Sequence, residues 1–518
     1  MGSAPEEGAG LETPQGLKPG SVEPGVWRYG MAKRASVVID GEDYFALIQQ
    51  AMLKAERRIL LIGWDFDTRI HLSKGRRWWQ KGHRSTYPSR LGSFVLWLAR
   101  HNSGLDIKIL KWSVGFLKWF ARGYMLADIL RWMPHKRIAF KFDNSHPIGG
   151  CHHQKIVVID DDFAVCGGID LTAHRWDTRD HIEDDPQRSR GGKNPYGPWH
   201  DMTMMMEGEI AGALDELGRT RWLKAGGGEL GVLDPQPGSA WPDELEAQFE
   251  NVEIGIARTS AEYDGFPQVE EIRELFVKQI ASAKRFIYAE NQYFASRDIA
   301  EAIAERMTQP DPPEVVVVHP QTADGRLEAV AMDPARARLV EALEQLDAHD
   351  RFHLFVPYTG ETPIYVHAKL LIVDDRILRV GSANFNGRSM GLDSECDVFI
   401  DCARAGNGHC SEQIQAIRHG LLAEHCGLEV AEVAEMLATH GSMAAMIAHH
   451  AKTGGRHLRP FAIPESGEIE QFLADNEWLN PDHAEDLLPG SSHKRGLFRR
   501  GSLLARGMRT LKRKKRRR

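Results

Sequence analysis

The chain has 518 residues, and its 42% hydrophobic and 26% charged content is typical of a soluble globular protein with roughly two to four domains. No stretch approaches the roughly 18 unbroken apolar residues that a membrane-spanning helix needs. Residues 491–518 hold 13 of the 65 Lys and Arg residues and no Asp or Glu, which leaves 52 basic and 72 acidic residues elsewhere. The body is therefore acidic, and this disfavours general nucleic-acid binding, which requires a basic face.

The predicted elements follow one order twice along the chain. Residues 1–28 lack the apolar core of a signal peptide and are expected to be disordered. An amphipathic helix over 43–56 then leads to a strand over 59–63, and the same order recurs over 272–283 and 286–289. Strands that alternate with helices favour an α/β fold in which helices cover both faces of a sheet. We therefore expect an internal duplication with two similar halves.

A short motif, His-x-Lys-x4-Asp, also occurs twice, and each copy lies beside a run that predicts a buried strand. Residues two apart on a strand point to the same face, so the His and Lys of each copy should face one site. Two imidazoles and two ammonium groups in one pocket are suited to holding and cleaving a phosphodiester. The copies are His153, Lys155 and Asp160, and His367, Lys369 and Asp374.

The chemistry of such a site needs one neutral imidazole to attack phosphorus and one protonated imidazole to donate to the leaving oxygen, with coupled titrations. Behind the second copy, Ser382 and its small neighbours allow close approach to a phosphate, and Asn384 can donate an amide hydrogen bond to it. The first half has Gly168 and Asp170 at these two places. Since this reaction runs without a metal and the six cysteines lack metal-type spacing, we expect no metal or other cofactor.

The paired motif resembles the phospholipase D superfamily, and its flanks resemble the eukaryotic-type members. The resemblance spans about residues 35–427. It implies two similar α/β domains, each a mixed β-sheet flanked by helices, packed with pseudo-twofold symmetry. Because there is no room for eukaryotic lipid-targeting modules before the catalytic region, a compact bacterial enzyme is expected. The matching flanks are Gly-Gly-Ile-Asp-Leu at 167–171, Arg175-Trp176-Asp177, Pro198-Trp199-His200-Asp201, Glu290-Asn291-Gln292-Tyr293-Phe294 and Gly-Ser-Ala-Asn at 381–384.

The resemblance also implies residue roles in a two-step reaction through a phosphohistidine. One His attacks phosphorus, the other protonates the departing alcohol, and a carboxylate later in the chain orients each ring. The implied roles are His153 as nucleophile, His367 as general acid, Lys155, Lys369, Asn384 and Ser382 on the phosphate, and Asp201 and Glu395 as orienting carboxylates.

The expected activity is hydrolysis of a glycerophospholipid, such as phosphatidylcholine, to phosphatidate and a free head-group alcohol, with possible transphosphatidylation. Three alternatives stay open. The absence of N-terminal membrane spans argues mildly against a cardiolipin synthase-type phosphatidyltransferase. The acidic body argues against a metal-independent nuclease, and the two intact motifs argue against a lipid-binding scaffold without activity.

Two local features have alternative interpretations. Asp160 and Asp374 each follow a strand at a turn, where Asp is common, so they either belong to the catalytic set or only cap the turn. His200 is expected to be a structural neighbour of Asp201 rather than a third catalytic imidazole.

The C-terminal tail has apolar residues on one predicted helical face among arginines, which is typical of an interfacial helix. A polybasic segment favours an anionic membrane surface; binding of nucleic acid or a solvated end are the alternatives. We expect a cytoplasmic protein, peripheral on the inner face of the cytoplasmic membrane, with phospholipid as substrate, no specific nucleic-acid partner and an open oligomeric state. The predicted segments are a disordered N-terminus (1–28), a first domain (29–228), a linker (229–252), a second domain (253–430), a helical extension (431–490) and the basic tail (491–518).

Overall fold

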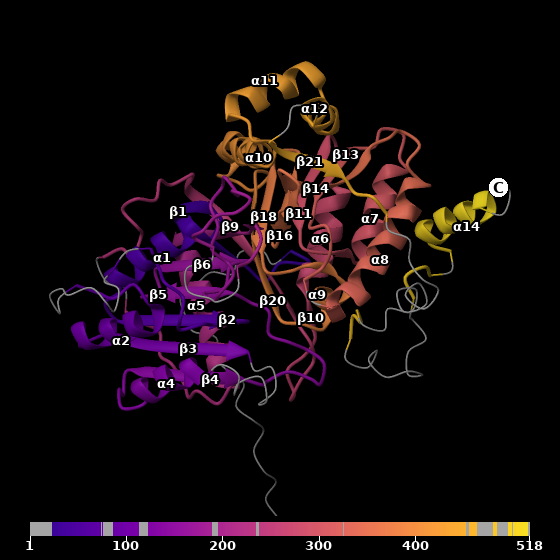
Figure 1. The fold of residues 1–518 in the computed structure, drawn as a ribbon. Coiled ribbons are helices and arrows are strands. Elements are labelled where there is room, and N and C mark those ends of the chain that lie inside the picture. The colour runs from indigo at the N-terminus through magenta and orange to yellow at the C-terminus, as the bar shows by residue number, and fades with distance from the viewer. Residues whose placement is uncertain are drawn as a thin grey trace, which may run out of the picture.

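The fold, seen in a computed structural model, is a large mixed β-sheet flanked by helices (Figure 1), and this confirms the predicted fold class. The first 22 residues of the predicted N-terminal segment lie outside the described residues, as do parts of the predicted extension and tail. The structure describes residues 23–73, 75, 86–112, 123–188, 195–234, 238–324, 326–451, 455–463, 480–483, 496–499 and 501–515.

The N-terminal half of the sheet is built from strands whose apolar side chains are buried. Its strands are β1 (Arg28–Ile39), β2 (Arg58–Gly63), β3 (Asp106–Trp112), β4 (Ile138–Asp143), β5 (Ile156–Ile159), β6 (Phe163–Gly167), β7 (Trp199–His200) and β8 (Met202–Gly208). Its helices are α1 (Gly41–Lys54), α2 (Leu91–His101), α4 (Gly123–Trp132) and α5 (Glu209–Lys224). β4, β3 and β2 are parallel neighbours, and β5, β6, β8 and β1 continue from β2 in antiparallel order.

The C-terminal half repeats this strand order. Its strands are β9 (Phe249–Ser260), β10 (Val269–Glu270), β11 (Phe286–Asn291), β12 (Phe294–Ala295), β13 (Glu314–Val318), β14 (Phe352–Thr359), β15 (Thr362–Pro363), β16 (Tyr365–Val366), β17 (Lys369–Val373), β18 (Ile377–Gly381), β19 (Phe385–Asn386), β20 (Glu395–Asp401) and β21 (Arg456–Pro460). β14, β13 and β11 are parallel neighbours, and β17, β18, β20 and β9 continue in antiparallel order.

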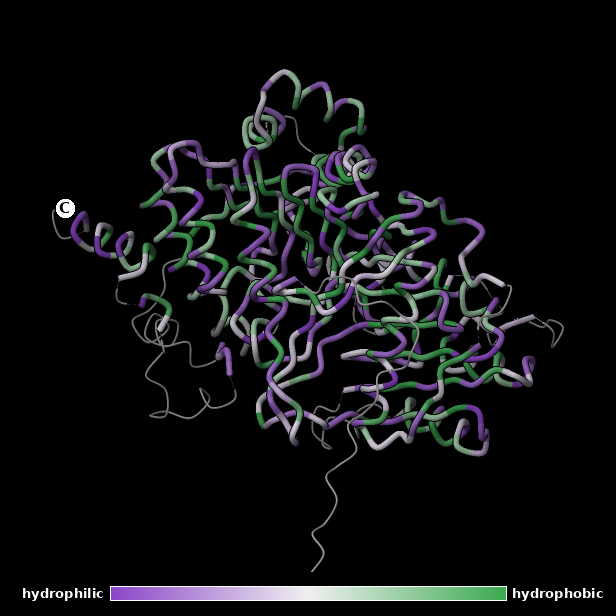
Figure 2. Tube along the Cα trace, turned by 180° about the vertical axis from the view of Figure 1, so that it is seen from behind, coloured by the Kyte–Doolittle hydropathy of each residue, from purple (hydrophilic) through white to green (hydrophobic). Residues whose placement is uncertain are grey.

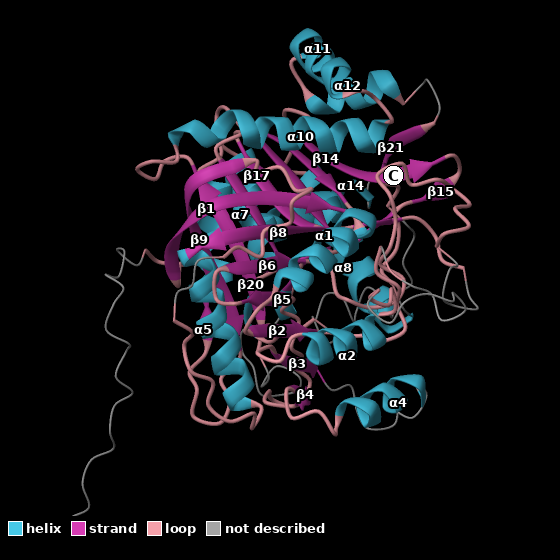
Figure 3. Cartoon of the chain, turned by 90° about the vertical axis from the view of Figure 1, so that its left-hand side faces the viewer, coloured by secondary structure: helices cyan, strands magenta, loops and turns pink. Residues whose placement is uncertain are grey.

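The helices of this half are α6 (Glu271–Ala281), α7 (Arg297–Met307), α8 (Arg326–Glu344), α9 (Gly387–Gly391), α10 (Ser411–Cys426), α11 (Val430–His440), α12 (Met443–His450) and α14 (Leu503–Lys515), with a short 3₁₀ turn (Gly408–Cys410) before α10. α1 and α2 pack on one face of the N-terminal half of the sheet, and α5 packs on the other. In the C-terminal half, α6, α7 and α8 cover one face and α10 the other. Figure 3 shows α10 lying along the strands of this half. Both faces are thus covered by helices, as the alternating pattern predicted.

The two halves join through β1 and β9, which pair in antiparallel fashion. β9 begins at Phe249, inside the segment 229–252 that was predicted as a linker. The start of β9 pairs with β1, Phe249 opposite Ala35 and Glu250 opposite Arg34. The exposed Glu250 and Asn251 break the apolar run, and a strand start with so few apolar residues reads as a loop in sequence.

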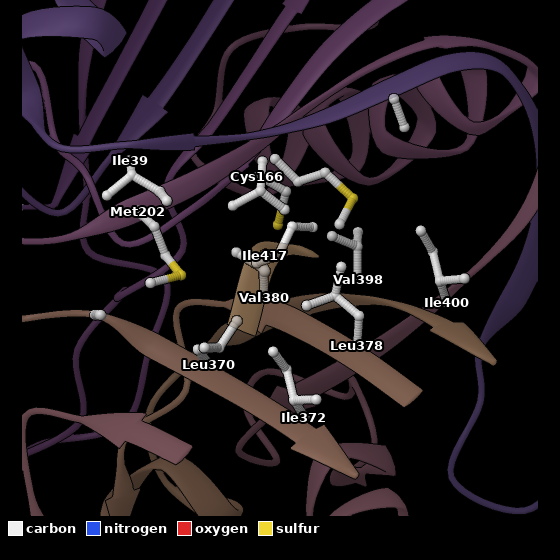
Figure 4. Close-up of a cluster of buried hydrophobic side chains, with 14 of the residues drawn as sticks. Ile39, Cys166, Met202, Leu370, Ile372, Leu378, Val380, Val398, Ile400 and Ile417 are labelled. Carbon is white, nitrogen blue, oxygen red and sulfur yellow. The ribbon is translucent and has the colours of Figure 1, made fainter. Parts of the chain in front are cut away.

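A shared apolar core fills the seam between the halves (Figure 4). Met202 and Cys166 of the first half face Leu378, Val380 and Val398 of the second, and all of them are buried. Figure 2 shows hydrophobic stretches, in green, running through the middle of the molecule. Since hydrophobic burial contributes about 25 cal/mol per Å² of apolar area, this seam stabilises one fixed arrangement of the halves.

The C-terminal region differs from its prediction in two places. The helix expected over 430–451 is split at Gly441, whose φ of 65° ends α11 before α12 begins. α14 packs against α7 and α8, and Leu504 and Met508 are buried in the same apolar cluster as Leu497. The apolar face that predicted an interfacial helix is therefore covered by the protein itself. Among the described helices, every one is too short or too polar to cross a lipid bilayer.

Candidate active site

Both motif copies lie at the seam between the halves. Backbone hydrogen bonds join the two halves next to each His. β7 pairs in parallel with β16, and the backbone N–H of His367 donates to the carbonyl of His200 at 2.7 Å. The backbone N–H of His153 likewise donates to the carbonyl of Ser394 at 2.9 Å. Each His is thus fixed from the opposite half of the chain.

Each imidazole is paired with a carboxylate from the opposite half. His153 Nδ1 lies 3.1 Å from Glu395 Oε2, and His367 Nδ1 lies 2.7 Å from Asp201 Oδ2. Both carboxylates are fully buried. Because these contacts occupy Nδ1 of each ring, they fix the ring orientation and leave Nε2 for a substrate. Sequence reasoning identified these four residues, but not that the pairs cross between the halves.

Burial controls the protonation of this site. Burial and the positive charges of Lys155 and Lys369 lower the pKa of His153 well below its usual value of 6.5. Burial and Lys369 lower the pKa of His367 in the same direction, and His153 contributes to this shift. The two rings therefore lie within electrostatic reach of each other. Burial raises the pKa of Glu395 well above its usual value of 4.5.

The two motif lysines are buried beside the rings. Lys155 Nζ donates to the carbonyl of His153 at 2.8 Å and lies 3.3 Å from Asp170 Oδ2. Lys369 Nζ donates to Gln292 Oε1 at 3.1 Å, and burial lowers its pKa to about 7. Two ammonium groups in a low-dielectric site are a favourable environment for a phosphate anion.

Ser382 and Asn384, both predicted to bind phosphate, differ in their surroundings. The Ser382 hydroxyl donates to Glu395 Oε2 at 2.5 Å, and its carbonyl lies 3.0 Å from His153 Nδ1. Ser382 therefore contacts the His153–Glu395 pair, and its predicted role as a phosphate ligand stays a prediction. Asn384 is buried, and its Oδ1 has no hydrogen-bond partner among the described residues.

Asp160 and Asp374 lie at the far ends of β5 and β17, away from the imidazoles. The Asp160 carboxylate accepts hydrogen bonds from the backbone N–H groups of residues 56–58, at 2.7, 2.8 and 2.8 Å. The Asp374 carboxylate accepts the equivalent bonds from residues 284–286, at 2.8, 2.8 and 2.9 Å. These contacts are those of the turn-capping alternative, and the catalytic assignment of the two residues stays a prediction.

The first half replaces Ser382 and Asn384 by Gly168 and Asp170, and the structure gives the reason. A Cβ atom on Gly168 would lie 2.0 Å from Asp201 Oδ1, so only glycine leaves room for the carboxylate that pairs with His367. Asp170 accepts the backbone N–H of Trp64 at 3.0 Å and lies beside Lys155. In this half, a carboxylate that is already paired takes the place of the Asn384 side chain.

Three residues that were not predicted as site residues surround His367. The Trp199 ring lies 5.2 Å from the His367 ring, and it stacks on Tyr365 at 4.6 Å between centroids. The Arg175 guanidinium lies 4.2 Å from the Trp199 ring and lowers the pKa of His367. Arg175 has no carboxylate partner among the described residues. The signal in the sequence was the Arg-Trp-Asp and Pro-Trp-His-Asp flanks. Flanking residues alone do not show whether a side chain lines the site or packs in the core.

A cavity of about 750 Å³ lies on the other side of the chain from His153. His152 and Gln154 line it, together with Arg221, Lys224 and Ser394. His152 Nδ1 contacts the Ser394 hydroxyl at 2.7 Å. The alternation of side chains along this extended segment thus sends His153 to the imidazole pair and its two neighbours to a separate cavity.

Comparison with known proteins gives one family model and several relatives. Residues 276–417 match the model described as "Cardiolipin synthase, PLD-like domain". The chain is 26% identical to Phospholipase D A of Dictyostelium discoideum over an alignment of 435 positions, which covers 70% of this chain and 32% of that protein. It is 24% identical to Phospholipase D alpha 1 of Zea mays, over 75% of this chain and 64% of that protein. It thus spans between about a third and two thirds of the length of these relatives.

Among solved structures, the fold is similar to that of phosphatidylserine synthase from Haemophilus influenzae Rd KW20. The TM-score is 0.50 at 12% sequence identity, and the match covers 82% of this chain and 96% of that one. At this identity the similarity concerns the fold alone.

Proposed function

Because this chain belongs to the phospholipase D superfamily, we propose that it is a phosphodiesterase that hydrolyses the distal phosphodiester of a glycerophospholipid. The products would be phosphatidate and a free head-group alcohol. The observation that carries this proposal is the pair of imidazoles at the seam, each held at Nδ1 by a buried carboxylate from the opposite half. Such a pair can attack and protonate at one phosphorus atom.

In the first step, Nε2 of neutral His153 attacks phosphorus and forms a P–N bond. The P–O bond to the head group breaks, and His367 donates its Nε2 proton to the departing alcohol oxygen. The low pKa of His153 keeps this ring neutral, as a nucleophile must be. When the P–N bond forms, the ring becomes positively charged, and its Nδ1–H donates to the Glu395 carboxylate. We assign the nucleophile to His153 and the acid to His367 by resemblance to the family.

In the second step, His367 accepts a proton from water while the water oxygen attacks phosphorus. The P–N bond breaks, phosphatidate leaves and His153 returns to its neutral form. An alcohol in place of water would give transphosphatidylation by the same route. Lys155 and Lys369 would hold the non-bridging oxygens through both steps, with the Asn384 amide and Arg175 beside them.

The anionic substrate would also prepare the acid for its task. Without substrate, burial and the nearby cations keep the pKa of His367 low. A bound phosphodiester brings a negative charge between the lysines and opposes that effect, so protonation of His367 becomes more favourable in the complex. Binding and proton donation are thereby linked.

The test is product analysis on vesicles of mixed phospholipids. Wild-type protein is expected to release phosphatidate, whereas His153→Ala and His367→Ala should each lose activity by about 10⁴-fold or more, because each removes a reacting group. His409→Ala, at an exposed histidine, is the matched control. Turnover at wild-type rate by either active-site variant would contradict the mechanism.

A cardiolipin synthase-type phosphatidyltransferase is the second candidate, since the matching family model carries that description. The two activities share the phosphohistidine and differ in the acceptor. Phosphatidylglycerol as the added alcohol separates them: a synthase converts it to diphosphatidylglycerol, whereas a hydrolase gives mainly phosphatidate in its presence.

We further propose that the protein acts in the cytoplasm, peripherally on an anionic membrane surface, through the basic face of α14. Arg506, Arg509 and Arg513 are exposed on this helix, whose apolar face is buried in the protein. Attachment would therefore be electrostatic, with about 1 kcal/mol from each charge near the surface. Co-sedimentation with anionic vesicles should weaken in high salt and in an Arg506→Glu, Arg509→Glu variant, and should be unaffected by either if the proposal is wrong.

A further inference from the structure

A buried cluster of two histidines and two carboxylates lies directly behind the His367–Asp201 pair. Its members are Asp40 after β1, His181 in the loop before β7, His200 in β7 and Glu424 in α10. All four are buried, and each offers one ligand-type atom within 4.8 Å of the others. They come from four separate segments of both halves, so no spacing in the sequence indicated a metal here.

The distances inside this cluster bring the imidazole nitrogens and carboxylate oxygens close enough to surround one metal ion. His200 Nδ1 lies 2.8 Å from Glu424 Oε1 and 3.1 Å from Asp40 Oδ1. His181 Nε2 lies 3.2 Å from Glu424 Oε1 and 3.5 Å from Asp40 Oδ2. Zinc–ligand bonds of about 2.0–2.2 Å in tetrahedral geometry place neighbouring ligand atoms about 3.3–3.6 Å apart. The longest of the four contacts lies in this range, and a bound ion would move the three shorter ones apart by up to about 0.5 Å.

Two of these atoms are close to oppositely charged groups without bonding to them. His200 Nδ1 and Asp40 Oδ2 are fully buried, and neither has a hydrogen bond of acceptable geometry among the described residues. Buried polar atoms are normally paired, and an unpaired one calls for an explanation such as an ion. Atoms that are near each other but misaligned for hydrogen bonds point to a common centre.

The outer contacts of the cluster also fit a metal site. The second nitrogen of each imidazole contacts a carboxylate: His181 Nδ1 lies 3.0 Å from Asp177 Oδ2, and His200 Nε2 lies 2.6 Å from Glu290 Oε2. Metal-binding histidines almost always carry such a partner, which fixes the tautomer and turns the free nitrogen to the ion. Asp40 has φ 65° and ψ 162°, a backbone conformation rare outside glycine, so the fold holds this carboxylate in place under strain.

We propose that Asp40, His181, His200 and Glu424 bind one divalent transition-metal ion, for which zinc is the best match to two nitrogens and two oxygens. Two carboxylates balance the charge of the ion with both imidazoles neutral. All four positions are filled by protein, so the site is structural and leaves no place for a substrate. In the neighbouring set of His200, Glu290 and His425, both imidazoles make aligned hydrogen bonds to the carboxylate. In the proposed site, His181 Nε2 makes such a bond to Glu424 Oε1, whereas His200 Nδ1 makes none among the described residues.

The ion would stabilise the geometry of the catalytic pair. Asp40 makes two hydrogen bonds with the backbone of Asp201. The Asp40 N–H donates to the Asp201 carbonyl at 2.8 Å, and the Asp40 side-chain Oδ1 accepts the Asp201 N–H at 3.1 Å. His200 accepts the N–H of His367, and Glu424 brings in α10 of the second half. A metal at this point would tie both halves to the carboxylate that orients His367.

The first experiment is metal analysis of the full-length protein, produced without a polyhistidine tag. We expect about one zinc or other divalent transition-metal ion per chain. His181→Gln and Asp40→Asn should each lower this content at least about tenfold, since outer and inner ligand losses reduce affinity by such factors. His425→Gln, a matched change in the neighbouring hydrogen-bonded set, should keep the full content. Native protein without stoichiometric metal would overturn the proposal, as would equal metal content in all variants.

A refolding experiment keeps the proposal testable if the ligand variants do not fold. Wild-type protein is unfolded in chelator, then refolded with added zinc or with chelator still present. We expect a higher yield and a higher thermal unfolding temperature with zinc, because binding stabilises only the folded form. Equal yield and equal unfolding temperature in both samples would overturn it. Neither experiment uses turnover, so the result is independent of the proposed phosphodiesterase activity.

Discussion

Burial gives Lys369 an ammonium group that loses its proton near neutrality, because the pKa of this side chain is lowered to about 7. A lysine is charged below its pKa, so the free protein is expected to bind an anionic phosphodiester less well as the pH rises above 7. kcat/KM, which reports the free enzyme, should then fall by up to about tenfold per pH unit. A pH profile measures this. Lys369→Arg, which stays charged, should lose the alkaline decline, and an unchanged decline would contradict the assignment.

Glu395 is expected to matter through its charge on His153. Glu395→Gln keeps the shape of the side chain but removes the carboxylate that holds His153 Nδ1 and accepts the hydroxyls of Ser382 and Ser389. Loss of such an orienting carboxylate lowers kcat by about 10²- to 10⁴-fold in comparable sites, with a smaller effect on KM. Steady-state kinetics measures the split. Glu412→Gln, at an exposed acid in α10, is the control, and equal rates in both variants would exclude this role.

At the level of single residues, the sequence predicted the reacting groups better than their partners. Residue types and spacing in the motif predict that His153 and Lys155 share a face, because a strand has a period of two. No local pattern tells whether Glu395 serves the ring of its own half or that of the other, since this depends on how the halves pack. Trp199 and Arg175 were missed for the same reason.

Asp160 and Asp374 are expected to affect stability and not chemistry. Each carboxylate accepts hydrogen bonds from three backbone N–H groups that lead into β2 or β11, so truncation leaves these donors without a partner. Asp160→Ala and Asp374→Ala should each lower the free energy of unfolding by about 1–3 kcal/mol. Chemical denaturation measures this. Glu246→Ala, at an exposed loop residue, should change little, and a variant that stays stable but loses kcat would restore the catalytic interpretation.

Among the elements, buried strands were the easiest to predict and the packing of amphipathic helices the hardest. β5 and β13 are continuous apolar runs, and such runs identify a strand buried on both faces. α14 has the same apolar stripe whether it packs on a membrane or on α7 and α8. Hydrophobic periodicity shows that one helix face is covered, but it does not show whether a membrane or another helix covers it. The sequence prediction missed the start of β9, because the exposed Glu250 and Asn251 interrupt the apolar pattern of the strand.

The whole molecule is expected to fold and work only with both halves present. The seam core takes side chains from each half, so a separated half would expose a large apolar face. Residues 23–248 and 249–518 expressed alone should aggregate and lack activity, whereas co-expression should recover soluble, active protein. Size-exclusion chromatography and product analysis measure this. A single half that is monomeric and active would contradict the crossed arrangement of the site.

The duplication itself was visible in the sequence, but its geometry was not. Repeated helix–strand order and a repeated motif predict two similar halves, and the matching strand orders agree with this. The division into domains 29–228 and 253–430 stays a prediction, because β1 pairs with β9 and the sheet is continuous across the boundary between them. Pairing between strands more than 200 residues apart leaves no local signal in a single sequence.

The crossed His–carboxylate pairs also limit how such a chain can have arisen and how it can still change. A single-unit ancestor with this arrangement would have lacked an orienting acid for its own imidazole, and two copies related by a dyad would have supplied it to each other. After fusion, neither half can lose its site residues alone. Loss from one half would remove its own imidazole and also the carboxylate that pairs with the imidazole of the other half. Genetic redundancy, the usual consequence of gene duplication, is therefore absent from this molecule.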